Sequence, residues 1–224
     1  MGDGGASASA ELMKESGQSR KDPAIPRASP LNEASLRIAS WNVRTMYETG
    51  VSAQVANEMQ RYRIHILGVS ETHWTQSGEI CLGTGEKILY SGREDGKHAA
   101  GVAIILNRTA QKSLRGWEPH GERIITASFK TRHKSINLNL IQIYAPTNEA
   151  LDEDKEDFYN KLQDVYNKLP KKDVNIVLGD ANAKIGQDNT GYELVMGCNG
   201  LGEMNDNGER LANFCASNSL VIGG

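Results

Sequence analysis

Hydrophobic and polar positions follow two different periods along the chain, which predicts a mixture of strands and helices. Residues 36–43 carry apolar side chains at alternate positions, as a strand does. The following segment has the spacing of a helix face, with apolar side chains three or four residues apart at Val51, Val55, Met59 and Tyr62. Residues 64–69 then form an apolar run that is expected to be a buried strand.

The same alternation of strands and helices continues to the end of the sequence. Further strands are expected at residues 87–91, 101–106, 124–129, 135–144 and 174–178. A helix is expected between Leu151 and Pro170, because Phe158, Leu162 and Val165 share one face and its first turn is acidic. A short helix at 211–215 and a final strand at 220–222 complete the pattern. Long antiparallel strands with interspersed helices indicate a layered α/β fold.

Composition divides the chain into two parts. Residues 1–35 are rich in Gly, Ser, Ala, Pro and charge, and Trp41 is the first aromatic residue. Such a segment buries too little apolar surface to offset its ordering entropy, so a disordered tail is expected there. Residues 36–224 are expected to form a single domain without internal repeats.

The charge and cysteine content narrow the classes of function. The chain has 25 Lys and Arg against 28 Asp and Glu, a net charge of -3, which excludes nucleic-acid binding by a diffuse basic surface. Basic residues do gather between Arg108 and Lys134, either as a solvated strand face or as a phosphate contact. The three cysteines are widely spaced and match no zinc-binding or disulfide pattern, so we expect a reducing compartment, nuclear or cytoplasmic. We expect neither secretion nor membrane association. We also expect a monomer.

Two glycine-containing segments resemble nucleotide-binding loops only superficially. Residues 92–98 (GREDGKH) are one residue short of a phosphate-binding loop, with His98 where a hydroxyl is required, and a hairpin turn is expected instead. Residues 197–202 (GCNGLG) reverse the glycine spacing of a dinucleotide site and are expected to be a loop.

Five polar residues share one position, the C-terminal end of an apolar strand. They are Asn42 (SWNVR), Glu71 (GVSETHW), Tyr144 (QIYAPTN), Asp180 and Asn182 (LGDAN). Each one alone is explained by a turn. Because α/β folds bind ligands at the carboxyl ends of their strands, the set together predicts a site.

These segments resemble the endonuclease/exonuclease/phosphatase superfamily, whose signature is WN, a Glu ending a later strand, YxP and GDxN. The resemblance extends from Leu36 to the last residue, and the stretch from YAPTNEALDEDKEDFYNKLQDV to NDNGERL is similar to the endonuclease domain of LINE-type retrotransposons. It implies a four-layer α/β sandwich and magnesium-dependent hydrolysis of DNA phosphodiester bonds, as in apurinic endonucleases.

The resemblance also implies a role for each residue. Glu71 would hold magnesium or manganese, a hard cation that proteins bind through one or two carboxylates. Asp180 would accept the proton of the attacking water, with Asn182 beside it on the same strand edge because alternate residues face the same way. Asn42 would orient Glu71 or a phosphate oxygen, and the Tyr144 hydroxyl would donate to the phosphate as it gains charge.

Three further positions complete the expected site. Asn205 and Asn207 would contact substrate, or serve only as turn and cap residues. Arg44 is a weaker substrate candidate; repair-type apurinic endonucleases carry an acidic residue at this position, and Arg matches the retroelement branch.

Family members also carry an Asp-His pair in a C-terminal segment. No Asp or His follows Glu209 here. The resemblance therefore implies an incomplete sandwich and impaired turnover, since one lost electrostatic donor costs about 10²–10³ in rate. Two other functions fit the same residues, a phosphomonoesterase acting on inositol phosphates or lipids and a catalytically inactive remnant or interaction module.

Overall fold

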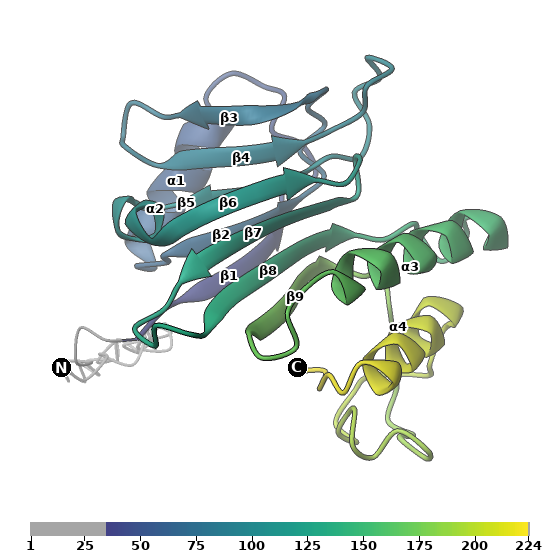
Figure 1. Ribbon diagram of the computed structural model, residues 1–224. Helices are drawn as coiled ribbons and strands as arrows, with labels where there is room; N and C mark the ends of the chain where they lie inside the picture. The colour runs from purple at the N-terminus through teal and green to yellow at the C-terminus, as the bar shows by residue number, and fades with distance from the viewer. Residues whose placement is uncertain (1–34, 224) are drawn as a thin grey trace, which may run out of the picture. The chain divides into compact units, whose positions relative to one another are not determined.

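The computed structural model describes residues 35–223, which fold into two β-sheets flanked by helices (Figure 1). The five-stranded sheet has the order β1-β2-β5-β4-β3, and the four-stranded sheet has the order β6-β7-β8-β9. The strands of the first sheet are β1 (Ile38–Asn42), β2 (Ile66–Ser70), β3 (Ser77–Cys81), β4 (Lys87–Ser91) and β5 (Val102–Leu106). Those of the second are β6 (Leu114–Pro119), β7 (Ile124–Lys130), β8 (Asn137–Tyr144) and β9 (Val174–Asp180). Most neighbours are antiparallel, but β1–β2 and β8–β9 are parallel.

The two sheets pack face to face through an apolar core. Ile66 and Ile104 of the first sheet meet Phe129 and Leu140 of the second in one buried cluster. Because side chains alternate along a strand, the neighbouring Leu67 and its equivalents point to the opposite face. Both sheets therefore have a second apolar face that requires a cover.

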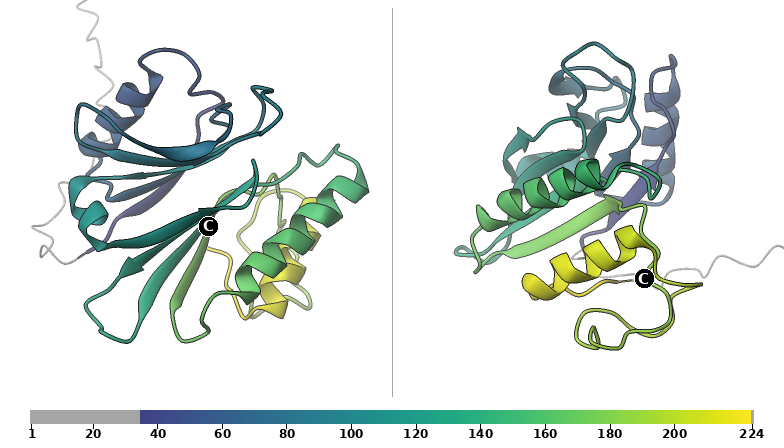
Figure 2. Two further views of the ribbon diagram at one scale, coloured as in Figure 1. Left: turned by 45° about the horizontal axis from the view of Figure 1, so that its top comes forward. Right: turned by 90° about the vertical axis from the view of Figure 1, so that its right-hand side faces the viewer.

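Helices provide those covers (Figure 2). Helix α1 (Val51–Arg61) packs Val55 and Met59 on the outer face of the five-stranded sheet. Helices α3 (Asp152–Asn167) and α4 (Asp206–Ser217) cover the four-stranded sheet. The short α2 (Arg108–Ser113) places Ala110 at the margin of the inter-sheet core. The order helix, sheet, sheet, helix confirms the predicted α/β sandwich.

Most predicted elements are confirmed, and the errors lie at the edges of the sheets. The final strand predicted at residues 220–222 is wrong, because this segment packs irregularly on α4 and donates from Ile222 N to Val195 O (2.7 Å). Strands β3 and β6 were not predicted, because their sequences SGEIC and LRGWEP contain few apolar residues and no regular alternation. Helix α2 was missed because it has six residues and depends on its Asn107 cap.

Two predicted segments have the expected local structure, and one lies elsewhere. Residues 92–98 belong to the connection between antiparallel β4 and β5, as a hairpin turn requires, and 197–202 form a loop. The disordered tail predicted for residues 1–35 lies, apart from Ser35, outside the described residues. Within the described part, none of the helices has the length and apolarity to cross a bilayer.

One polar contact interrupts the inter-sheet core. The Gln142 amide of β8 donates to Ser70 Oγ of β2 (2.9 Å), and both side chains donate to Ile143 O at 3.1 Å. Both residues are fully buried. Gly68 lies opposite because a Cβ there would collide with Gln142 Oε1. A single hydrogen-bonded pair thus sets the register between the sheets directly below their carboxyl ends.

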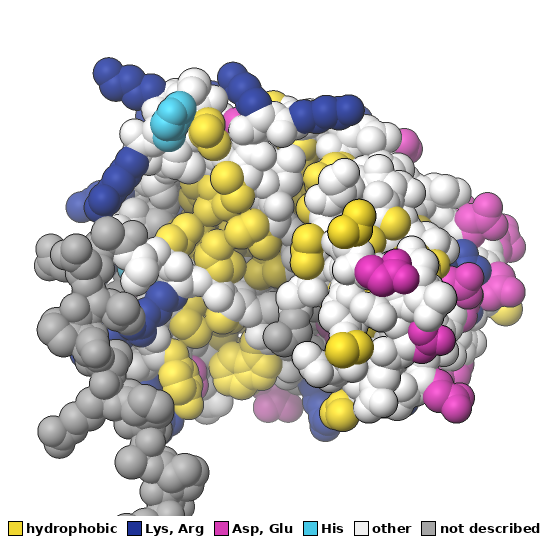
Figure 3. All heavy atoms as spheres, turned by 90° about the horizontal axis from the view of Figure 1, so that it is seen from below, with side chains coloured by type: hydrophobic (Ala, Val, Ile, Leu, Met, Phe, Trp, Pro, Cys, Tyr) yellow, Lys and Arg dark blue, Asp and Glu magenta, His cyan; other side chains and the backbone are white. Residues whose placement is uncertain are grey.

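The outer edge of β9 borders an apolar hollow. Figure 3 shows apolar side chains gathered on this face, viewed from below. The hollow, about 540 Å³, lies between β9, α4 and residues 219–223, with Ser40 of β1 at its rim. Within residues 35–223, β9 pairs only with β8 and β1 only with β2, so both strands present a free edge.

The glycine of the GDAN segment generates a stability prediction. Gly179 has φ 137°, and a Cβ there would collide with Ile143 O of the neighbouring strand. Gly179→Ala should therefore lower the free energy of unfolding by about 3 kcal/mol through strain and overpacking. Gly116→Ala is the matched control in β6, where nothing lies within 4 Å of the new Cβ. Urea unfolding measures the free energy of unfolding of both variants. Equal unfolding midpoints for the two variants would contradict the predicted collision with Ile143 O.

Candidate active site

The four strands that carry the predicted residues end at one place. Asn42 is the last residue of β1 and pairs in register with Ser70, the last residue of β2. Glu71 is therefore the first residue after β2. Tyr144 closes β8 and pairs with Asp180 at the end of β9. Strands β1 and β9 also contact each other across the junction of the sheets. Parallel pairing within each sheet and contact between them therefore bring all four residues to one edge.

Asn42 joins the two carboxylates of this edge. Its Nδ2 donates to Glu71 Oε1 and to Asp180 Oδ2, both at 2.7 Å. Its Oδ1 accepts from Arg44 N at 3.0 Å, which fixes which end of the amide faces the carboxylates. One amide thus holds together acids that are 109 residues apart in the sequence and belong to different sheets.

Asn182 reaches the same edge through a turn. Strand β9 ends at Asp180, whose Oδ1 accepts from Asn182 N at 2.9 Å. Asn182 Nδ2 then donates to Ala145 O at 2.9 Å. The expectation that alternation along the strand positions Asn182 is wrong, because the strand has ended and an Asp-centred turn directs the side chain.

Three candidate site residues have left-handed backbone conformations. Arg44 has φ 62°, Glu71 has φ 60° and Asn182 has φ 47°. Such conformations cost about 1–3 kcal/mol in residues other than glycine and occur at functional sites, where the surrounding structure enforces them. At Glu71 the following residue is held by two bonds, Thr72 N to Gly101 O (3.1 Å) and Met46 N to Thr72 O (3.0 Å).

Tyr144 lies between cationic and anionic neighbours. The Arg123 guanidinium is 5.1 Å from the centre of the Tyr144 ring, and its Nη1 donates to Tyr144 O at 3.1 Å. Burial and the negative charge of Glu71 raise the pKa of the Tyr144 hydroxyl. The hydroxyl therefore keeps its proton and remains a hydrogen-bond donor.

The weaker candidates are arranged differently from one another. Arg44 is exposed beside Asn42, free to meet a ligand. Asn205 caps α4, accepting from Gly208 N at 2.8 Å, so the cap interpretation explains it. Asn207 has no exposed surface and donates to Pro146 O at 2.9 Å, so the substrate contact expected of it is not supported. Both asparagines also donate to Asn182 O at 3.3 Å and so brace the loop that carries Asn182.

The donors at this edge fit a hard divalent cation. Glu71 and Asp180 converge on one amide nitrogen, so their like charges lie close together and a bound cation would offset their repulsion. Within the described residues no group of three or more His, Cys, Asp and Glu could hold a metal ion. One or two carboxylates supplemented by water and substrate oxygens are the pattern typical of magnesium.

Sequence reasoning missed four residues that support the site. Arg123 contacts Tyr144, the Ser70–Gln142 pair lies beneath the site, and Gly179 permits the close approach of β9 to β8. A signal existed for Gln142, a polar residue inside the apolar strand LIQIY. For Arg123 the sequence offered only its place in the basic stretch between Arg108 and Lys134, because its contact with Tyr144 depends on tertiary proximity.

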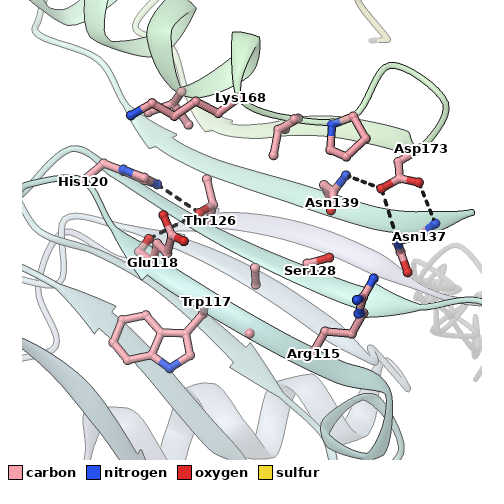
Figure 4. Close-up of a pocket in the computed structure, with 15 residues that line it drawn as sticks. Arg115, Trp117, Glu118, His120, Thr126, Ser128, Asn137, Asn139, Lys168 and Asp173 are labelled. Carbon is pink, nitrogen blue, oxygen red and sulfur yellow. Dashed lines mark hydrogen bonds between the residues drawn. The ribbon is translucent and has the colours of Figure 1, made fainter.

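A second hollow, of about 440 Å³, lies away from this edge (Figure 4). It lies over the outer face of the four-stranded sheet, beside the end of α3. Its carboxylate Asp173 accepts from Asn137 N (3.0 Å) and from the Asn137 and Asn139 amides, which lower its pKa. His120 lies at hydrogen-bonding distance from Thr126 Oγ1 (3.0 Å), and burial lowers its pKa. The Asp173 carboxylate is thus held by two asparagines, and the His120 ring by Thr126. Among the described residues that line this hollow, no pair of carboxylates is joined by one amide, as Glu71 and Asp180 are.

Comparison with known proteins gives a family match and two curated relatives. The model of the Endonuclease/Exonuclease/phosphatase family matches residues 39–209. Craniofacial development protein 2 of Tragulus javanicus is 36% identical over 97% of this chain, and that of Bos taurus is 39% identical over 83%. The matches cover 38% and 30% of those relatives, so the chain spans well under half their length.

Solved structures share the fold at low sequence identity. The endonuclease domain of TRAS1, a telomere-specific non-LTR retrotransposon, is 18% identical with a TM-score of 0.56, and 84% of this chain and 74% of that domain are covered. The AP endonuclease LMAP of Leishmania major is 13% identical with a TM-score of 0.57, covering 82% and 66%. The family expected from the WN, YxP and GDxN segments is confirmed: this chain belongs to the endonuclease/exonuclease/phosphatase family.

Proposed function

We propose that this chain hydrolyses phosphodiester bonds in DNA with the help of magnesium. The observation that carries the proposal is the Asn42 amide that binds Glu71 and Asp180 together at the strand ends. The likeness to the TRAS1 endonuclease domain and to AP endonucleases supports DNA as the substrate. The resemblance of residues 144–211 to LINE-type endonuclease domains supports the same choice over inositol phosphates or lipids.

The residues divide the work of hydrolysis among them. Asp180 accepts a proton from a water molecule while the oxygen of that water bonds to phosphorus. One ester P–O bond breaks, and the leaving oxygen takes up a proton from solvent. The two carboxylate oxygens of Asp180 provide about four acceptor positions, and Asn42 and Asn182 N occupy two. Tyr144 O–H donates to a phosphate oxygen as charge develops there. Glu71 would hold magnesium, and the ion would neutralise negative charge on the phosphate. Arg44 attracts the substrate backbone.

Removing either acid should abolish nicking of supercoiled plasmid or cleavage of an abasic oligonucleotide. We expect Glu71→Gln and Asp180→Asn each to lower the rate by about 10² or more, because each removes one charged participant. Asp164→Asn, an exposed acid on α3, is the matched control and should leave the rate unchanged. The native chain cleaving no faster than the double variant would refute the proposal. Parallel assays with inositol phosphates test the alternative substrate class.

Magnesium binding can be measured separately from catalysis. Millimolar magnesium should raise the melting temperature of the native chain, because a ligand that binds only the folded state stabilises it. The shift should disappear in Glu71→Gln and persist in Asp164→Asn. An equal shift in all three chains would show that the ion binds elsewhere.

Tyr144→Phe isolates the role of the hydroxyl. The ring and its contact with Arg123 remain in this variant, so folding should be unchanged. We expect a loss of about 10² in the nicking rate at saturating substrate, the cost of one transition-state donor. An unchanged rate would place the hydroxyl outside the reaction.

A further inference from the structure

An aromatic hollow lies on the loops that carry the candidate site. Its lining comprises Tyr47, Trp74, Thr75, Ile80, Tyr90 and His98, around a volume of about 340 Å³. Tyr47 follows Asn42 by five residues and Trp74 follows Glu71 by three. Tyr47 and Trp74 therefore lie on the loops that follow Asn42 and Glu71, while Ile80 and Tyr90 belong to β3 and β4.

Hydrogen bonds hold these loops against each other. Trp74 Nε1 donates to Met46 O at 3.0 Å, next to Tyr47. His73 N donates to Ala100 O at 2.8 Å, and His98 Nδ1 lies 3.0 Å from His73 O, so the β4–β5 connection joins them. The aromatic rings are held in place on a braced surface, not carried on separate segments.

Part of the aromatic lining is open to solvent. The Tyr47 and His98 rings lie 4.3 Å apart, and Trp74 meets Tyr90 edge to face at 5.0 Å. Tyr47 is 63% exposed and Ile80 is 39% exposed, high values for large apolar side chains beside a buried core. Within the described part of the chain no Asp or Glu lines the hollow, and exposed residues of both signs flank it in sequence, the cations Arg44 and Lys97 and the acids Glu48 and Glu79. A planar, uncharged group matches this lining.

We infer that this aromatic hollow stacks an unpaired nucleobase of DNA bound at the adjacent site. Every base has a π face that stacks on aromatic side chains without regard to sequence. Inside a duplex both faces of a base are already stacked on its neighbours, so only a single-stranded or extruded base can enter. The inference rests on the proposed function and adds a preference for unpaired DNA.

Binding of short oligonucleotides in EDTA tests the inference without catalysis. Fluorescence anisotropy compares a labelled single strand, the matched duplex and an abasic strand of equal length and charge. The native chain should bind the single strand best. Tyr47→Ala should weaken that binding about 5- to 150-fold, the range for one stacked base, and leave binding of the abasic strand unchanged.

Two matched variants separate stacking from loss of structure. Tyr47→Trp keeps a flat ring and should retain native affinity. Tyr62→Ala removes another exposed tyrosine, 54% exposed, at the C-terminal end of α1, a helix about 16 Å long, and should change nothing. Equal affinity of the native chain and Tyr47→Ala for the single strand would overturn the inference.

Failure of this inference can be distinguished from failure of the proposed function. A Glu71→Gln, Asp180→Asn double variant should still bind the single strand, with the same sensitivity to Tyr47→Ala. If the native chain nicks plasmid but Tyr47→Ala changes no affinity, the inference fails and the proposed function stands. If Tyr47→Ala weakens binding but no chain nicks, base stacking stands without hydrolysis.

Discussion

The structure depends on one constraint, the burial of two apolar sheet faces against each other. Ile66, Ile104, Phe129 and Leu140 interlock between the sheets, and every other layer follows from this contact. Since strand side chains alternate, the faces turned away from the core are also apolar and must be covered by α1, α3 and α4. The edges where β1 and β9 meet are the part of the sandwich that this packing leaves accessible.

The candidate site forms because β1 and β9 contact each other and because each is parallel to its neighbouring strand. Parallel pairing aligns Asn42 with Ser70 in one sheet and Tyr144 with Asp180 in the other. Neither sheet alone contains both acids. The Asn42 amide spans the junction, so the distances within the site depend on how the two sheets pack against each other.

Much of this arrangement could be predicted from periodicity. The buried strands and the amphipathic helices α1 and α3 have strong patterns, and their ends place Asn42, Glu71, Tyr144 and Asp180 at strand termini. What periodicity cannot predict is pairing across the chain. The bonds from Asn42 link residues 29 and 138 positions apart, and the contact of Arg123 with Tyr144 spans 21. Strands β3 and β6 could not be predicted because SGEIC and LRGWEP lack the alternation of apolar residues that identifies a strand.

The Gln142–Ser70 hydrogen bond has a consequence for how the core tolerates change. Apolar side chains of similar volume exchange with little penalty, whereas a buried hydrogen bond forms only where donor and acceptor stay within reach of each other. Ser70 precedes Glu71, and Gln142 lies two residues before Tyr144. Displacement of one sheet relative to the other would separate two fully buried polar side chains, which costs free energy. The bond therefore favours the alignment of the sheets that brings the groups at the strand ends together.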